Sequence, residues 1–117
     1  MRRVVITGAG CVTPLGTSPE ELWANLVAGR SGVGPLTLFD AGRFPVRIAA
    51  QDKDWPPPGG GDELLPWHKW PRQTQFALSA GQQAAQQAGL KEARVDSRRL
   101  GVYLGCGEPF EDFAKFA

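Results

Sequence analysis

The sequence predicts an α/β fold in which helices cover a mixed, mainly parallel sheet. Two short apolar runs, at residues 3–7 and 101–105, each end in glycine-containing turns, as strands buried on both faces of a sheet do. Between them, residues 72–88 repeat small apolar side chains at helical spacing. Strand, helix and strand in this order predict a right-handed crossover, so we expect the two runs to be parallel neighbours or near neighbours in one sheet.

Both predicted strands have a simple composition. The first contains Val4-Val5-Ile6, a β-branched run, and is followed by the turn Thr7-Gly8-Ala9-Gly10. The second is Gly101-Val102-Tyr103-Leu104-Gly105, again followed by glycine. Because neither run alternates apolar with polar residues, both predict strands that are covered on their two faces.

A helix is predicted over residues 19–28. Ser18 can cap its first turn, Pro19 suits the first helical position, and Glu21 completes a capping box three residues after the cap. Gly29 is placed to end the helix in a left-handed conformation.

The second predicted helix, residues 72–88, carries a stripe of alanine and glycine. Such a stripe buries little apolar area, so it favours close approach to another helix or to a sheet. We expect the glutamines to face water or a partner, and Gly89 to end the helix; these glutamines are Gln82, Gln83, Gln86 and Gln87.

Residues 30–62 are rich in glycine and proline, which predicts irregular surface chain. The segment Arg47-Ile48-Ala49-Ala50 is a candidate for a short extended piece. Glu63-Leu64-Leu65, with Trp67 and Trp70, is a candidate for a helical turn whose length neighbouring prolines limit.

Composition bounds the class of protein. The 117 residues are 42% hydrophobic and 21% charged, with a net charge of +1, which suits one domain or part of one and favours no nucleic-acid or anionic-membrane partner. No apolar run approaches the roughly 18 residues that span a bilayer, so we expect a cytoplasmic location. Cys11, Cys106 and His68 have no metal-ligand spacing, so we expect reduced thiols, no metal and no cofactor.

The turn Gly8-Ala9-Gly10 follows a predicted strand, the setting of a dinucleotide-binding glycine loop. Thr13 replaces the third glycine of that fingerprint and Pro14 follows, so a helix cannot begin where the motif requires one. We therefore expect the turn to be structural or part of another kind of site. A nucleotide-binding domain is a third class of function, behind the two named below.

Cys106 lies between two glycines after a predicted strand, where a thiol can have a lowered pKa and act as a nucleophile. The alternative is a small buried residue. No His, Asn or Asp constellation accompanies it, because His68 stands alone in an aromatic and proline-rich segment. We expect neither Cys106 nor Cys11 to be catalytic, and we do not expect His68 to act as a base.

Two further groups have a functional and a structural interpretation. Near the C-terminal end, acids could form an acidic site, although acids at the head of a helix more often favour its dipole; they are Glu108, Glu111 and Asp112. Three tryptophans could form a binding surface or pack a loop onto the body; they are Trp55, Trp67 and Trp70.

Colinear blocks of the sequence resemble one family. Residues 2–16, from Arg2-Arg3-Val4 to Thr13-Pro14-Leu15-Gly16, are similar to the N-terminal signature of β-ketoacyl-acyl-carrier-protein synthases, the condensing enzymes of fatty-acid and polyketide synthesis. Further blocks agree in order: Leu22-Trp23, Ser31-Gly32-Val33-Gly34, Phe39-Asp40, Phe44-Pro45, Thr74-Gln75-Phe76-Ala77-Leu78, Ala88-Gly89-Leu90 and Arg99-Leu100-Gly101-Val102. The resemblance covers nearly the whole chain.

The resemblance implies a partial thiolase-like fold, with residues 1–117 an incomplete N-terminal domain. It implies an acyltransferase that condenses acyl groups with malonyl-acyl carrier protein and works as a dimer. The family's catalytic cysteine and two histidines lie beyond the region that this sequence resembles, so no catalytic residue is assigned here and the substrate-binding residues are unknown. The alternative is a non-catalytic, chain-length-determining partner subunit of a condensing enzyme.

Overall fold

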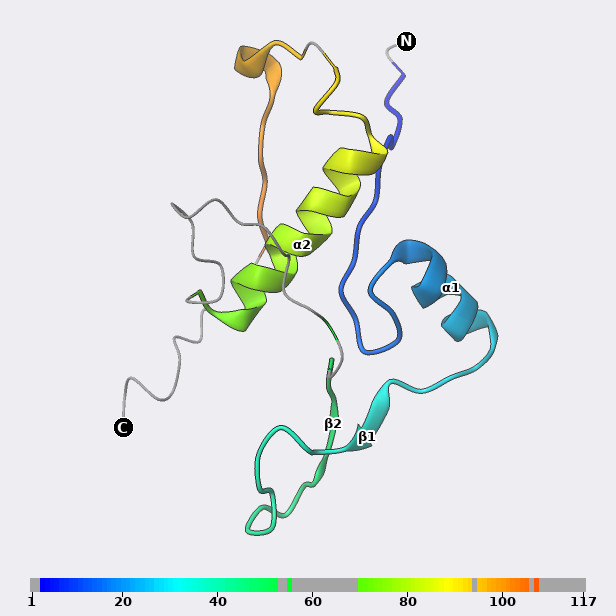
Figure 1. The fold of residues 1–117 in the computed structure, drawn as a ribbon, viewed down its shortest axis with the longest axis vertical. Coiled ribbons are helices and arrows are strands. Elements are labelled where there is room, and N and C mark those ends of the chain that lie inside the picture. The colour runs from blue at the N-terminus through cyan, green and yellow to red at the C-terminus, as the bar shows by residue number, and fades with distance from the viewer. Residues whose placement is uncertain (1–2, 53–54, 56–69, 94, 106, 108–117) are drawn as a thin grey trace.

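The computed structural model describes residues 3–52, 55, 70–93, 95–105 and 107. Its elements, in chain order, are α1 (Pro19–Val27), β1 (Val33–Pro35), β2 (Ile48–Ala50), α2 (Arg72–Gln87) and the 3₁₀ helix η2 (Ser97–Arg99). Figure 1 shows α2 as the long central element, with α1 and the β1–β2 pair on the side of the N-terminal chain. Among the described residues no helix has the length and hydropathy that crossing a bilayer requires.

Helix α1 forms where its caps predict it. The Ser18 hydroxyl accepts a hydrogen bond from the Glu21 amide at 3.2 Å, which satisfies one of the free amides of the first turn. The Glu21 carboxylate reaches back to the Thr17 amide at 2.9 Å, one residue earlier than in a standard capping box. Gly29 has φ +67°, which confirms the predicted left-handed end.

Helix α2 confirms the second predicted helix to within one residue. It begins after Pro71, and Ala88 is its C-cap, so the helical span is one residue shorter than expected. Gly89 has φ +64°, a conformation that glycine adopts without the penalty other residues incur. The predicted turn that includes residues 63–67 lies outside the described residues.

The sheet differs from the prediction. Strands β1 and β2 pair antiparallel, with Val33 opposite Ala50 and Pro35 opposite Ile48. Strand β2 confirms the extended piece expected near residues 47–50, but the sheet is two-stranded and lies away from the predicted strands. In the part of the chain that the structure describes, the mainly parallel sheet and its crossover are therefore not formed.

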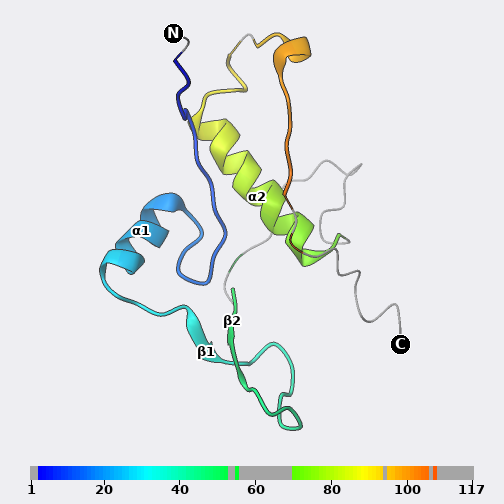
Figure 2. The same ribbon diagram turned by 180° about the vertical axis from the view of Figure 1, so that it is seen from behind.

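The predicted strands at residues 3–7 and 101–105 are both wrong as strands. Each segment is extended chain without a β-ladder; in Figures 1 and 2 residues 101–105 run beside α2, whereas residues 3–7 extend past its C-terminal end. The side chains are bare: Val4 is 94% exposed and Tyr103 is 96% exposed. A strand needs a neighbouring backbone about 4.8 Å away to satisfy its amides and carbonyls, and no described segment supplies one.

The buried core is small. Trp55 is buried against Phe76 in an edge-to-face pair with ring centroids 4.9 Å apart, and the Arg72 guanidinium lies 5.1 Å from the Phe76 ring centroid. Ala41 is the other buried apolar residue among those described. This cluster anchors the N-terminal end of α2 to the chain that follows β2.

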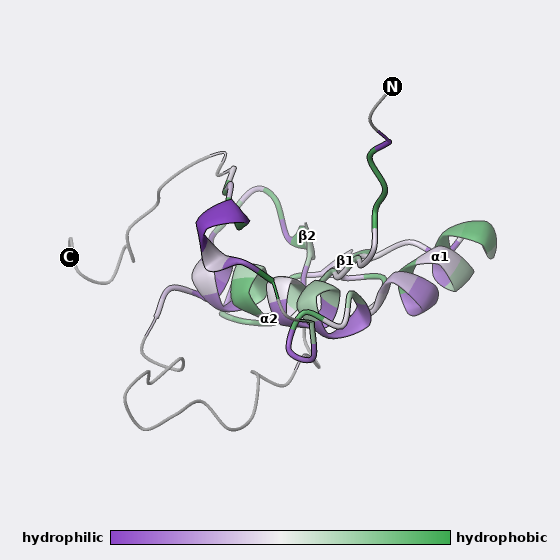
Figure 3. Ribbon diagram, turned by 90° about the horizontal axis from the view of Figure 1, so that it is seen from above, coloured by the Kyte–Doolittle hydropathy of each residue, from purple (hydrophilic) through white to green (hydrophobic). Residues whose placement is uncertain are grey.

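Most apolar surface remains uncovered. The chain exposes 10376 Å², whereas a compact monomer of its mass exposes roughly 6200 Å². Its radius of gyration is 17.4 Å, compared with about 13 Å for a compact domain of this length. Figure 3 shows the hydrophobic colouring of the N-terminal extended segment, which projects away from α2. Since Ala41 and Trp55 are the buried apolar residues among those described, the described elements do not close a hydrophobic core of their own.

Candidate functional site

The glycine turn lies directly on the backbone of α2. A Cβ atom at Gly10 would lie 2.0 Å from the Ala80 carbonyl oxygen, and one at Gly8 would lie 2.1 Å from the Ala84 carbonyl oxygen. Both distances are far below any real contact, so only glycine fits at these positions. The small-residue stripe of α2 thus makes a close approach, as predicted, but what it meets is neither a helix nor a sheet: it is the chain's own N-terminal segment.

Two glutamines of α2 hold this segment by its backbone. Gln83 accepts a hydrogen bond from the Cys11 amide at 3.1 Å and donates to the Cys11 carbonyl at 3.2 Å. It also donates to the Thr17 carbonyl at 2.8 Å. One turn along, Gln87 accepts from the Ala9 amide at 2.7 Å. We call Gln83 and Gln87 together the glutamine clamp.

The glutamine clamp replaces a strand on one edge of the N-terminal segment. The side-chain amide of Gln83 carries the same donor and acceptor as a peptide group, so it can pair with both backbone groups of Cys11 as a neighbouring strand would. We expected the glutamines to face water or a partner; Gln83 and Gln87 instead bind the backbone of their own chain, a contact that the prediction missed. Glutamine spacing along a helix, four residues apart and beside an alanine stripe, was the available signal.

After the clamp, the chain makes a tight turn. The amide and carbonyl of Thr13 pair with the carbonyl and amide of Gly16, each at 3.0 Å. Gly16 is buried, and a Cβ there would lie 2.8 Å from Cγ of Glu21. Asn25 donates to the Leu15 carbonyl, which ties the turn to α1. The turn therefore leads the chain from the N-terminal segment, which lies on α2, into α1.

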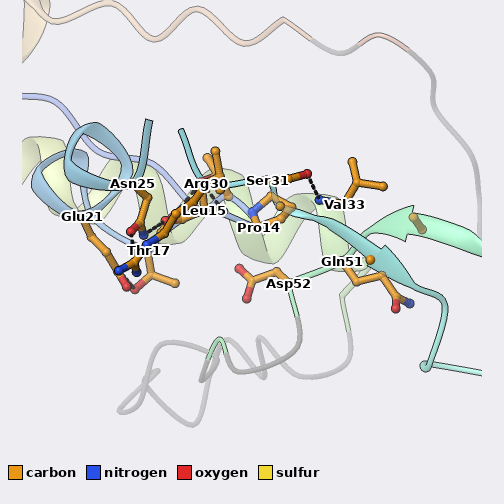
Figure 4. A pocket seen from close by; sticks show the side chains of 15 residues that line it. Pro14, Leu15, Thr17, Glu21, Asn25, Arg30, Ser31, Val33, Gln51 and Asp52 are labelled. Atoms are coloured by element: carbon orange, nitrogen blue, oxygen red, sulfur yellow. Dashed lines mark hydrogen bonds between the residues drawn. The ribbon is translucent and has the colours of Figure 1, made fainter. Parts of the chain in front are cut away.

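A cavity of about 530 Å³ opens beside this turn. The turn and α1 form one wall, and β1 with the residues after β2 forms the other (Figure 4). Asp52, on the segment that follows β2, is one of the lining residues and is drawn between the two walls in Figure 4. The volume suits a small ligand, and the lining is largely polar.

The polar groups of this cavity are mostly engaged within the chain. The Glu21 carboxylate accepts from Thr17, and Arg30 donates to the Asn25 side chain at 3.0 Å. The side-chain Oε1 of Gln51 accepts from the Thr37 amide at 2.9 Å, while Nε2 of the same side chain is buried without a hydrogen-bond partner. The described lining residues include neither cysteine nor histidine. Within the described part of its lining, the cavity therefore presents no thiol or imidazole for nucleophilic catalysis.

Cys11 lies beside the clamp and is half-buried. Burial raises the pKa of its thiol, and the nearby carboxylates of Glu20 and Glu21 raise it further. A nucleophilic cysteine needs a lowered pKa, because the thiolate is the reactive form. That Cys11 is not catalytic stays a prediction, now with a physical reason.

Of the other residues that the sequence analysis singled out, some lie within the described part of the chain and some do not. Trp55 packs a loop onto α2, as the structural interpretation expects. Trp70 is 37% exposed and lies just before α2. Outside the described residues lie Trp67, His68, Cys106, Glu108, Glu111 and Asp112. Within the described ranges, no group of three potential metal ligands occurs.

Comparison with known proteins assigns the family. The profile of the family described as beta-ketoacyl synthase, N-terminal domain, matches residues 1–115. The chain therefore belongs to the β-ketoacyl synthase family. Membership implies the thiolase-like fold, of which the described residues form two α-helices and a two-stranded antiparallel sheet.

Relatives of two kinds match the chain. It is 43% identical over 106 residues to 3-oxoacyl-acyl-carrier-protein synthase 2 of Coxiella burnetii, covering 91% of this chain and 25% of that protein. In Streptomyces glaucescens it is 40% identical to the tetracenomycin polyketide synthase ketoacyl synthase beta subunit, over 89% of this chain and 25% of that one. The alpha subunit of the same synthase is 36% identical, over 89% and 24%. The chain thus spans about a quarter of the length of these relatives.

Proposed function

We propose that this chain is the N-terminal part of a 3-oxoacyl-acyl-carrier-protein synthase. Such an acyltransferase condenses an acyl group with malonyl-acyl carrier protein, with loss of carbon dioxide, in fatty-acid or polyketide synthesis. The observation that carries the proposal is the match of residues 1–115 to the family's N-terminal domain, supported by 43% identity to a synthase. Acyl carrier protein is the proposed partner, the complete enzyme is a dimer, and its location is cytoplasmic.

Within that enzyme, the described residues act as a scaffold. The glutamine clamp and the glycine contacts place the N-terminal segment on α2. The raised pKa of Cys11 gives no activated nucleophile. We expect the 117 residues by themselves, as part of a domain, to lack condensing activity, and we assign no catalytic step to them.

The experiment is a decarboxylation assay on the purified 117-residue chain. With malonyl-acyl carrier protein we expect no carbon dioxide release above the buffer rate. After incubation with an acyl-acyl-carrier-protein thioester, mass spectrometry should find no stable acyl adduct on Cys11 or Cys106. Carbon dioxide release that is lost in Cys11→Ser or Cys106→Ser would show that the chemistry lies in this chain.

A non-catalytic partner subunit is the second candidate. It is favoured by the 40% identity to a ketoacyl synthase beta subunit, which is no lower than the 36% identity to the alpha subunit of the same synthase. The coding sequence that follows these residues discriminates between the two. A frame that continues to a cysteine at a helix start and to two histidines indicates the enzyme, and a frame in which that cysteine is replaced indicates the partner subunit.

A further inference from the structure

We draw no further inference here: the strongest candidate, the polar cavity of about 530 Å³ between the wall formed by the turn at residues 13–16 with α1 and the wall formed by β1 with the residues after β2, carries nothing, because its charged side chains are already engaged within the chain and nothing in the structure shows what ligand would occupy it.

Discussion

Replacing Gly10 with alanine tests the contact that organises the N-terminal segment. The added Cβ would lie 2.0 Å from the Ala80 carbonyl oxygen and 2.8 Å from Cβ of Gln83. An ordinary carbon–oxygen contact is about 3.3–3.6 Å, so the segment must move away from α2 by over about 1 Å. Overpacking of this kind costs about 1–3 kcal/mol.

The same movement breaks the clamp. The two hydrogen bonds between Gln83 and Cys11 are already 3.1 and 3.2 Å long, near the upper limit for this type, so a shift of about 1 Å breaks them. Each contributes about 0.5–1.5 kcal/mol. We therefore expect Gly10→Ala to destabilise the docked segment by at least about 2 kcal/mol, which is roughly a thirtyfold change in its opening equilibrium.

Amide hydrogen exchange measures this opening directly. The amides of Ala9 and Cys11 are bound by Gln87 and Gln83, so their protection reports the docked state. Gly10→Ala should lower both protection factors about thirtyfold. The matched control is Gly81→Ala, because no atom lies within 4 Å of its added Cβ and alanine favours a helix by roughly 1 kcal/mol. Equal protection in the two variants would refute the docking of the glycine segment on α2.

Three other predictions concern the Ser18 cap, the Cys11 thiol and the Trp55 side chain. Ser18→Ala should destabilise α1 by about 1 kcal/mol and speed hydrogen exchange of the Glu21 amide, because the cap is lost. Ser18→Asp keeps a capping oxygen and should restore slow exchange. Equal exchange rates in Ser18→Ala and Ser18→Asp would contradict the capping role. In a Cys106→Ser background, iodoacetamide should alkylate Cys11 with a pH midpoint above that of a free cysteine peptide, because burial raises its pKa, and Glu20→Gln should lower the midpoint only in part. The pKa of the Cys11 thiol is higher in the folded chain than in the unfolded chain. The stability that this thiol contributes is therefore present below its unfolded pKa and is lost as the pH rises through its folded pKa. A docked segment that becomes more stable at alkaline pH would contradict the raised pKa. Trp55→Ala should detach the chain after β2 from α2, seen as faster exchange at Phe76, and unchanged exchange would argue against this anchor.

Features with local causes were predicted correctly from the sequence. The Ser18 cap and the left-handed Gly29 and Gly89 depend on atoms within a few residues, so the pattern of residue types is sufficient. The span of α2 followed from its alanine spacing for the same reason.

The predicted strands failed because their determinants are not local. Composition indicates that residues 3–7 and 101–105 favour an extended conformation, and both are drawn as extended chain in Figure 1. A strand, however, also requires backbone hydrogen bonds from another segment, and the residue types of residues 3–7 and 101–105 do not specify which segment provides them. Among the described residues, the glutamine clamp supplies such hydrogen bonds at residues 9–11, and none supplies them at residues 3–7 or 101–105.

The candidate site was predicted in part. The failed dinucleotide fingerprint correctly left a structural turn as one interpretation of Gly8-Ala9-Gly10. The clamp was missed, because glutamine on a helix more often faces water, and the spacing of Gln83 and Gln87 places them on one face without indicating a partner 72 residues away. The raised pKa of Cys11 also depends on burial and on the position of α1, which residue spacing does not provide.

By itself, the sequence determined the two helices, their ends and membership of the ketoacyl synthase family, because caps, periodicity and colinear blocks are properties of neighbouring residues. Only the tertiary structure shows why residues 8 and 10 must be glycine. It brings Gly8 and Gly10 against Ala84 and Ala80, where the absence of a Cβ lets two backbones touch. It also turns Gln83 into the hydrogen-bond partner that a strand would otherwise need, since only folding brings a donor and an acceptor to Cys11 from 72 residues away.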